Sequence, residues 1–180
     1  YMETVKQKEN KAFKTLGAKY GYKNVMAAPH LVKIVVSVGT GSAIKRDKNR
    51  NTFIMDRLAK ITGQKPATRK AKKSIASFKV RQGDQIGVMV TLRGARMYGF
   101  LEKLINVAMP RTKDFRGIER KIVDDIGNMT LSIKEHTIFP ETGDEELKDV
   151  FGLGVTVVTT AKTKAEALDF FELIGVPFKK

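Results

Sequence analysis

The stretch KITGQKPATRKAKKSIASFKVRQGDQIGVMVTLRG, residues 60–94, decides the fold of this chain. Its second half alternates strictly between two kinds of residue. One set of positions is apolar throughout, and the other is mostly polar or small: Ile86, Val88, Val90 and Leu92 against Gln85, Gly87, Met89, Thr91 and Arg93. A period of two residues predicts a half-buried strand over residues 85–93. Such a strand turns one side to a core and leaves the other side for solvent or a ligand.

The first half of the stretch is strongly basic. Between Lys60 and Gly83 there are eight Lys or Arg residues and no Asp or Glu. Residues 69–83, the basic loop, also contain Ile75 and Phe78. A cationic loop with an aromatic residue is typical of a nucleic-acid-binding segment, because it offers charge for phosphates and an apolar plate for bases or sugars. The alternative is an ordinary mobile surface loop with Phe78 packed back onto the protein.

The composition supports a polyanionic partner. The chain has 180 residues and a formal net charge of +15, which favours nucleic acid over other partners. A membrane surface would require a basic amphipathic helix with bulky apolar residues, and none is found, so no membrane partner is expected. No apolar run reaches the ~18 residues of a membrane helix, and the Lys-rich start is atypical of a signal peptide. The absence of cysteine suits a reducing compartment.

Periodicity elsewhere predicts helices over residues 5–20, 47–62, 95–108 and 164–174, and further strands over residues 31–38, 129–133 and 153–161. Strands with one apolar face and helices between them indicate an α+β fold. We expect one domain over residues 1–180, with a single antiparallel or mixed sheet that helices cover on one face. The open face is predicted to bind RNA and to display Lys33, Ser37, Gln85, Thr91 and Arg93.

The sequence lacks the groups that an enzyme needs. There is no cysteine nucleophile, and His30 and His136 are each isolated from catalytic partners. The turn at residues 39–41 lacks the Gly-Lys-Ser/Thr that would complete a phosphate-binding loop. Asp124 and Asp125 are adjacent acids in a polar loop, which are ordinarily solvated. We therefore expect no catalytic residue, no metal site and no cofactor.

One region stands out as acidic. Residues 141–149 hold five acids against one lysine, within a longer charged region that spans residues 111–150. Acids in a chain that lies on RNA should point away from the phosphates. They form either a solvated loop or a docking surface for a basic protein.

Several segments together resemble one protein family. They are Thr62–Pro66, Thr68–Gly83, Val90–Gly94 with Arg96 and Met97, Pro110 and Arg111, Asp114–Gly117, Gly127 and Asn128, Phe139–Glu141, Thr159–Ala161 and the tail Val176–Lys180. In order and spacing they are similar to the bacterial-type large-subunit ribosomal proteins that bind 5S rRNA, the L-five family. The resemblance spans nearly the whole chain.

The resemblance implies a non-enzymatic, cytoplasmic protein of the large ribosomal subunit, located in the central protuberance. Its partners would be 5S rRNA, the large-subunit rRNA, the elbow of the P-site tRNA and a small-subunit protein at an inter-subunit bridge. For 5S rRNA the family pattern points to Gln64, Thr91 and Arg93, to which the open face adds Lys33 and Ser37. For tRNA it points to Lys70, Lys72, Lys73, Ser74, Phe78, Lys79 and Arg81. For the bridge, the candidates are Asp114, Phe115, Arg116, Glu141, Asp144, Glu145 and Glu146.

Three positions depart from the family pattern: Ser37 where the family has Asn, the segment 123–126 where it has Phe-Asp-Gly, and His136 where Gln is common. A freestanding RNA chaperone or regulatory RNA-binding protein with the same basic face is the alternative function. A nucleotide-handling enzyme is a third class, but it would need the missing phosphate loop and acid–base groups.

Overall fold

The computed structural model describes residues 3–41, 49–113, 115–143 and 150–179. The chain forms two compact units, each assembled from separate stretches of sequence. Unit 1 contains residues 1–34, 93–131 and 156–180, and unit 2 contains residues 35–92 and 132–155. Strands β1, β4 and β5 have residues in both units. The expectation of a single domain stays a prediction.

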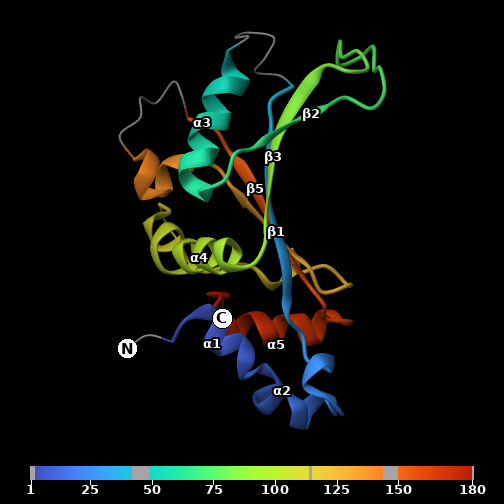
Figure 1. Cartoon of the computed structure of the whole chain (residues 1–180), viewed down its shortest axis with the longest axis vertical. Coiled ribbons are helices and arrows are strands. Elements are labelled where there is room, and N and C mark those ends of the chain that lie inside the picture. Colours follow the sequence, from blue (N-terminus) through green and yellow to red (C-terminus); the bar gives the residue numbers. More distant parts are fainter. Residues whose placement is uncertain (1–2, 42–48, 114, 144–149, 180) are drawn as a thin grey trace. The chain divides into compact units, whose positions relative to one another are not determined.

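The described residues form a five-stranded sheet in the order β2-β3-β1-β5-β4, so the α+β prediction is confirmed (Figure 1). The strands are β1 (Leu31–Gly39), β2 (Ala67–Lys70), β3 (Gln85–Leu92), β4 (Met129–Ile133) and β5 (Leu153–Thr159). The pairing is antiparallel: β2 pairs antiparallel with β3, with Thr68 opposite Val88. The end of β1 meets the start of β3, where the Thr40 N–H donates to the Ile86 carbonyl at 2.9 Å.

The predicted alternation is observed in the burial of β1, β3 and β5. Every second residue of β3, from Val88 to Leu92, is at most 2 % exposed. The same pattern holds in β1 for Ile34, Val36 and Val38, and it holds along β5. A one-residue slip of register would move all of these side chains to solvent, so their burial fixes the register of the sheet.

Helix α3 (Arg50–Thr62) packs against β3 in unit 2. Its residues Ile54, Leu58 and Ile61 are at most 2 % exposed, because they recur at helical spacing and share one face. The helix ends at Gly63, whose φ of +66° is the left-handed conformation that favours glycine at a C-cap. The predicted start at residue 47 lies outside the described residues, and the described helix begins at Arg50.

In unit 1, helix α5 (Lys164–Ile174) has the predicted bounds and packs against α1 (Val5–Asn10) and α2 (Ala12–Tyr20). A single helix over residues 5–20 is wrong, because the chain breaks at Lys11. Helices α1 and α2 differ in their packing partners. Helix α1 also packs against α4, where the Val5 N–H donates to Glu102 at 2.8 Å. These long-range contacts of the first piece are invisible in the local sequence.

Asp169 of α5 receives two side chains from the end of α2. The Tyr20 hydroxyl donates to Asp169 Oδ2 at 2.5 Å, and Lys19 forms an ion pair with the same oxygen. Burial raises the pKa of the Asp169 carboxyl, but the hydrogen bonds from Lys19 and Tyr20 outweigh it, and the pKa lies below its ordinary value. The α2–α5 contact is therefore partly electrostatic.

The predicted helix over residues 95–108 is observed as α4 (Ala95–Lys103) followed by one π-helical turn, η2 (Leu104–Ala108). Its predicted inward face is confirmed, since Met97, Leu101, Leu104 and Ala108 are at most 2 % exposed. Short 3₁₀ turns complete the described elements: η1 (Val25–Ala27), η3 (Met109–Arg111), η4 (Arg120–Ile122), η5 (His136–Ile138) and η6 (Pro140–Thr142).

Candidate nucleic-acid interface

The side of the sheet opposite the buried residues is smooth and polar. In unit 2 it carries Ser37, Thr91 and Ser132, with glycine at positions 87 and 154. A Cβ at Gly154 would lie 3.4 Å from Ser37 Oγ, so these two residues are neighbours on that side. In unit 1 the outward residues include Thr130 and Thr156, whose hydroxyl oxygens are 3.2 Å apart. We call this side the outward face.

Four of the five residues predicted for 5S rRNA belong to the outward face. Ser37 and Arg93 are exposed, and Lys33 and Thr91 are half-buried. Arg93 follows the last residue of β3, and its Nη1 donates to the Val32 carbonyl at 3.4 Å, which directs the side chain across β1. This single hydrogen bond is long, and the guanidinium has five N–H donors. Most of its donors therefore remain for a ligand.

Two polar side chains are engaged with the protein itself. Gln64 directly follows the C-cap of α3, and its Nε2 donates to the Thr91 carbonyl at 3.2 Å. This hydrogen bond holds the end of α3 against β3. Gln85, predicted to be displayed on the open face, accepts from Asn51 Nδ2 of α3 at 3.5 Å. That prediction is incomplete, because the alternation places Gln85 on the polar side but does not reveal the α3 donor beside it.

The basic loop is an ordered extension of a hairpin. Arg69 and Lys70 belong to β2, so the loop begins only at Ala71, in contrast to the predicted start at residue 69. Ala71 and Asp84 then pair through an N–H···O bond of 2.8 Å. Further out, Ile75 and Val80 exchange two backbone hydrogen bonds of 2.9 and 3.2 Å. We call residues 71–84 the hairpin tip (Figure 1).

Side chains of the hairpin tip reinforce this structure. Ser74 Oγ accepts from the Gln82 N–H at 2.9 Å, and Asp84 Oδ2 accepts from the Arg81 N–H at 2.7 Å. Lys79 adopts a φ of +51°, which closes the turn between Ile75 and Val80. Ser74 therefore has a structural bond in addition to any contact with tRNA.

The hairpin tip presents charge and apolar surface together. Its residues from Lys72 to Lys79 are all exposed, and Phe78 is 66 % exposed. Across the described ranges, Lys70, Lys72, Lys73 and Lys79 form no ion pair with a carboxylate. The rest of the protein therefore covers only a minor part of Phe78, and its role in RNA binding stays a prediction.

The residues predicted for the bridge are only partly described. Phe115 is half-buried and Arg116 is exposed, both in unit 1, whereas Glu141 is exposed in unit 2. Asp114, Asp144, Glu145 and Glu146 lie outside the described residues. The base of the 111–118 segment is fixed: the Ile118 N–H donates to the Pro177 carbonyl, and the Lys179 N–H donates to the Ile118 carbonyl, each at 2.8 Å.

Two of the three departures from the family pattern, His136 and the segment 123–126, make defined contacts within the protein. His136 is fully buried, stacks on Phe151 at 4.0 Å between ring centroids, and accepts the Phe151 N–H at Nδ1. In the 123–126 segment, Val123 is buried and Asp124 caps the turn by accepting the Asn128 N–H at 2.6 Å. Ile126 is 69 % exposed at the apex of that turn.

Reasoning from the sequence did not single out the hydroxyls of Thr130, Ser132 and Thr156 as binding candidates. The signal was available, because all three alternate with apolar residues in their strands. Arg69 of β2 was predicted as part of the basic loop and not as a residue of the sheet face. Its Nη2 lies 3.9 Å from Met89 Sδ on β3, which adds a cation to the same side of the sheet.

Other classes of site are absent from the described ranges. No group of three or more His, Asp or Glu residues there could hold a metal ion. Nor is any helix there long and apolar enough to cross a membrane. A cationic hairpin and a hydroxyl-bearing sheet face are features typical of an RNA-binding surface.

Comparison with known proteins gives the same class and a family. Residues 24–81 match the profile described as ribosomal protein L5, and residues 85–178 match the profile of the C-terminus of the same ribosomal family. The chain is 48 % identical to large ribosomal subunit protein uL5 of Desulforamulus reducens over 171 residues, covering 95 % of this chain and 94 % of the relative. It is 50 % identical to uL5 of Heliobacterium modesticaldum, covering 89 % of each chain.

A third relative, uL5 of Dictyoglomus thermophilum, is 47 % identical and covers 99 % of this chain and all of its own length. The chain therefore belongs to the ribosomal protein L5 family. It is a protein of the large ribosomal subunit and not an enzyme, as the resemblance implied.

Proposed function

We propose that this chain binds 5S rRNA through the outward face of its sheet, contacts the P-site tRNA through the hairpin tip, and joins an inter-subunit bridge through residues 111–150. The single observation that supports this proposal most strongly is the chemistry of the outward face. This face combines hydroxyls, glycines and cations. An ordinary solvated sheet face would not require that combination.

The outward face suits the shallow minor groove of A-form RNA. That groove displays 2′-hydroxyls and base edges, and a protein reads it by shape and by contacts to hydroxyl and phosphate oxygens. Ser and Thr hydroxyls both donate and accept, so they can pair with a 2′-hydroxyl in either sense. Glycine at positions 87 and 154 adds no side chain to this face. Lys33 and Arg93 supply charge for the phosphates.

The hairpin tip suits a second RNA contact. Its backbone hydrogen bonds join Ala71 to Asp84 and Ile75 to Val80, and they restrict the conformations of the tip. Binding therefore costs less ordering entropy than it would for a flexible loop. Figure 1 shows that the hairpin tip extends beyond the ends of β2 and β3, the two strands that it connects. The tip can contact a different RNA from the one on the outward face.

A variant of the hairpin tip tests this division of labour. Replacing Lys70, Lys72, Lys73 and Arg81 with Ala should leave most 5S rRNA binding in place and weaken tRNA binding to the P site. The measurements are P-site tRNA binding to reconstituted ribosomes and binding of the isolated protein to 5S rRNA. Equal losses in the two assays would place the hairpin tip in the 5S rRNA site and refute the division.

The bridge is tested by charge reversal in the acidic region. Changing Glu141, Asp144, Glu145 and Glu146 to Lys should leave 5S rRNA binding intact and weaken subunit joining at low magnesium. Polar interfaces of this kind are sensitive to salt and exchange quickly. Light scattering of mixed subunits measures joining, and unchanged joining would reduce the region to a solvated loop.

A further inference from the structure

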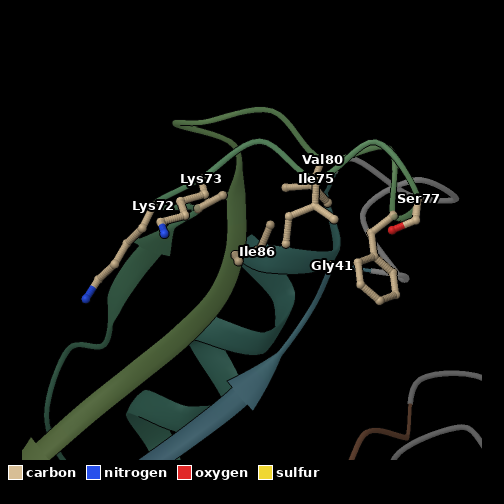
Figure 2. A pocket seen from close by; sticks show the side chains of 9 residues that line it. Gly41, Lys72, Lys73, Ile75, Ser77, Val80 and Ile86 are labelled. Atoms are coloured by element: carbon tan, nitrogen blue, oxygen red, sulfur yellow. The ribbon is translucent and has the colours of Figure 1, made fainter.

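An apolar groove lies beneath the hairpin tip in unit 2. Its volume is about 680 Å³, and its walls come from three segments: the end of β1 at Gly41, the first residues of β3 at Ile86, and the hairpin tip. From the tip, Ile75, Phe78 and Val80 line it (Figure 2). The volume lies within the ~300–1,000 Å³ range of pockets that bind small molecules and cofactors.

The groove walls are mostly apolar, and backbone groups of Ala71, Ile75 and Val80 are already paired. Ile75 and Val80 bond to each other through both N–H groups. Ala71 donates to Asp84 and accepts from Gly83. An extended peptide that binds by strand addition would need free backbone groups at such an edge. A flat ring does not, because it binds through its face.

The charge at the groove edge is cationic. Lys72 and Lys73 line the groove, and in Figure 2 their side chains extend away from Ile75 and Val80, so the ammonium groups lie at its margin. Phe78 is 66 % exposed and Ile75 is 46 % exposed, which is unusual for large apolar side chains. The site therefore combines a flat apolar interior with an anion-attracting margin. A nucleotide has the matching arrangement, a planar base joined to a phosphate.

We propose that this groove binds one unstacked RNA base, with its face against Phe78 and its flanking phosphates beside Lys72 and Lys73. The proposal rests on the proposed function of the hairpin tip as an RNA contact, and it specifies what the tip recognises. Backbone contacts alone would read only charge. A base in the groove adds a requirement for an unpaired, accessible nucleotide, which selects loops and folded corners of RNA over regular duplex.

The test compares two short oligoribonucleotides in which the other positions are abasic, one with a single central adenine and one with an abasic ribose at that position too. Both carry the same phosphates, so electrostatic attraction is equal. Fluorescence anisotropy with the protein should show the adenine oligonucleotide binding roughly 5- to 150-fold tighter, the range expected from one base–aromatic stack. Phe78→Ala should remove this difference. Because Phe78 is largely exposed, its truncation should leave the fold intact.

Lys70→Ala in β2 is the matched control. It removes one exposed charge near the hairpin tip, so it should weaken both oligonucleotides by the same factor and preserve their ratio. Equal affinity of the wild-type protein for the two oligonucleotides would overturn the proposal, as expected if the groove holds an apolar side chain of an acidic protein segment. A difference that survives in Phe78→Ala would also overturn it.

The outcome is separable from that of the proposed function. If the four-residue variant of the hairpin tip lowers P-site tRNA binding but adenine and abasic oligonucleotides bind equally, the tip contacts tRNA through charge alone. If the adenine preference is present but the four-residue variant leaves tRNA binding unchanged, the groove reads a different RNA.

Discussion

Filling the space above Gly154 should block RNA binding without unfolding the protein. Gly154 is half-buried on the outward face, where a Cβ would lie 3.4 Å from Ser37 Oγ and 3.9 Å from the Ser37 carbonyl oxygen. Both are ordinary contact distances, so a Cβ fits at this position, and the rest of a leucine side chain would project outward from the sheet. Because glycine weakens a strand by about 0.5–1 kcal/mol relative to alanine, stability should change by less than about 1 kcal/mol.

The effect on RNA should be larger. The added isobutyl group would stand on the surface that the RNA must approach, and the RNA would lose at least one specific contact. One such contact is worth about 1–3 kcal/mol, so the affinity for 5S rRNA should fall by about tenfold or more. The assay is binding of purified protein to 5S rRNA at fixed salt, with urea unfolding to confirm the folded state.

Gly99→Leu is the matched control, because Gly99 lies on the exposed side of α4 and a Cβ there has no atom within 4 Å. This variant should bind 5S rRNA like the wild type. If Gly154→Leu also binds 5S rRNA with wild-type affinity while folded, the RNA does not lie on this part of the sheet and the reasoning fails.

Three further predictions follow from single side chains. Arg93→Ala should cost about 1–3 kcal/mol of 5S rRNA binding with little change in thermal stability, whereas Lys60→Ala on α3 should cost much less; an unfolded Arg93→Ala protein would make the side chain structural. Gly117→Ala should destabilise the protein by about 1–3 kcal/mol in urea unfolding, since φ is +92° and a Cβ would lie 2.9 Å from Lys179 N; wild-type stability would contradict the tail contact. Asp169 has a lowered folded pKa, so its stabilisation is present above the ordinary pKa of about 4 and lost as pH falls through the folded value. Asp169→Asn should therefore lower the melting temperature at neutral pH, and this deficit should shrink as the pH falls below about 4. A deficit that does not change with pH would exclude this linkage.

Elements with strong local signals were predictable from the sequence. The alternation in residues 85–93 gives the right faces of β3 because every second side chain meets the core. The bounds of α5 follow from Thr163, whose hydroxyl caps the helix, and from Gly175 at φ +105°. In both cases the residues that fix the element lie within it or beside it.

Elements that depend on distant partners were not predictable. Strand β2 has the sequence ATRK, which shows no apolar alternation, and it is a strand because it pairs with β3. The break at Lys11 follows from contacts of α1 with residues far along the chain, such as Ile174, whose carbonyl accepts from Lys8 at 3.0 Å. The groove beneath the hairpin tip likewise depends on the approach of Gly41 to Ile86.

The candidate site divides along the same line. The polar alternation identified Ser37, Thr91 and Arg93 correctly as outward residues. The alternation could not show that the Gln64 amide donates a hydrogen bond to the β3 backbone, because that bond joins residues 27 positions apart. Nor could the charge pattern show that the basic loop is folded, since its order comes from backbone pairs such as Ile75 with Val80.

The central claim is that the outward face lies on 5S rRNA, and site-specific crosslinking tests it most directly. A photoreactive amino acid at Ser37, exposed on the outward face, should crosslink to 5S rRNA in assembled large subunits. The same group at Thr52, exposed on α3, should not. Crosslinks from Ser37 only to other RNA or to protein, or 5S rRNA crosslinks from Thr52 alone, would contradict the claim.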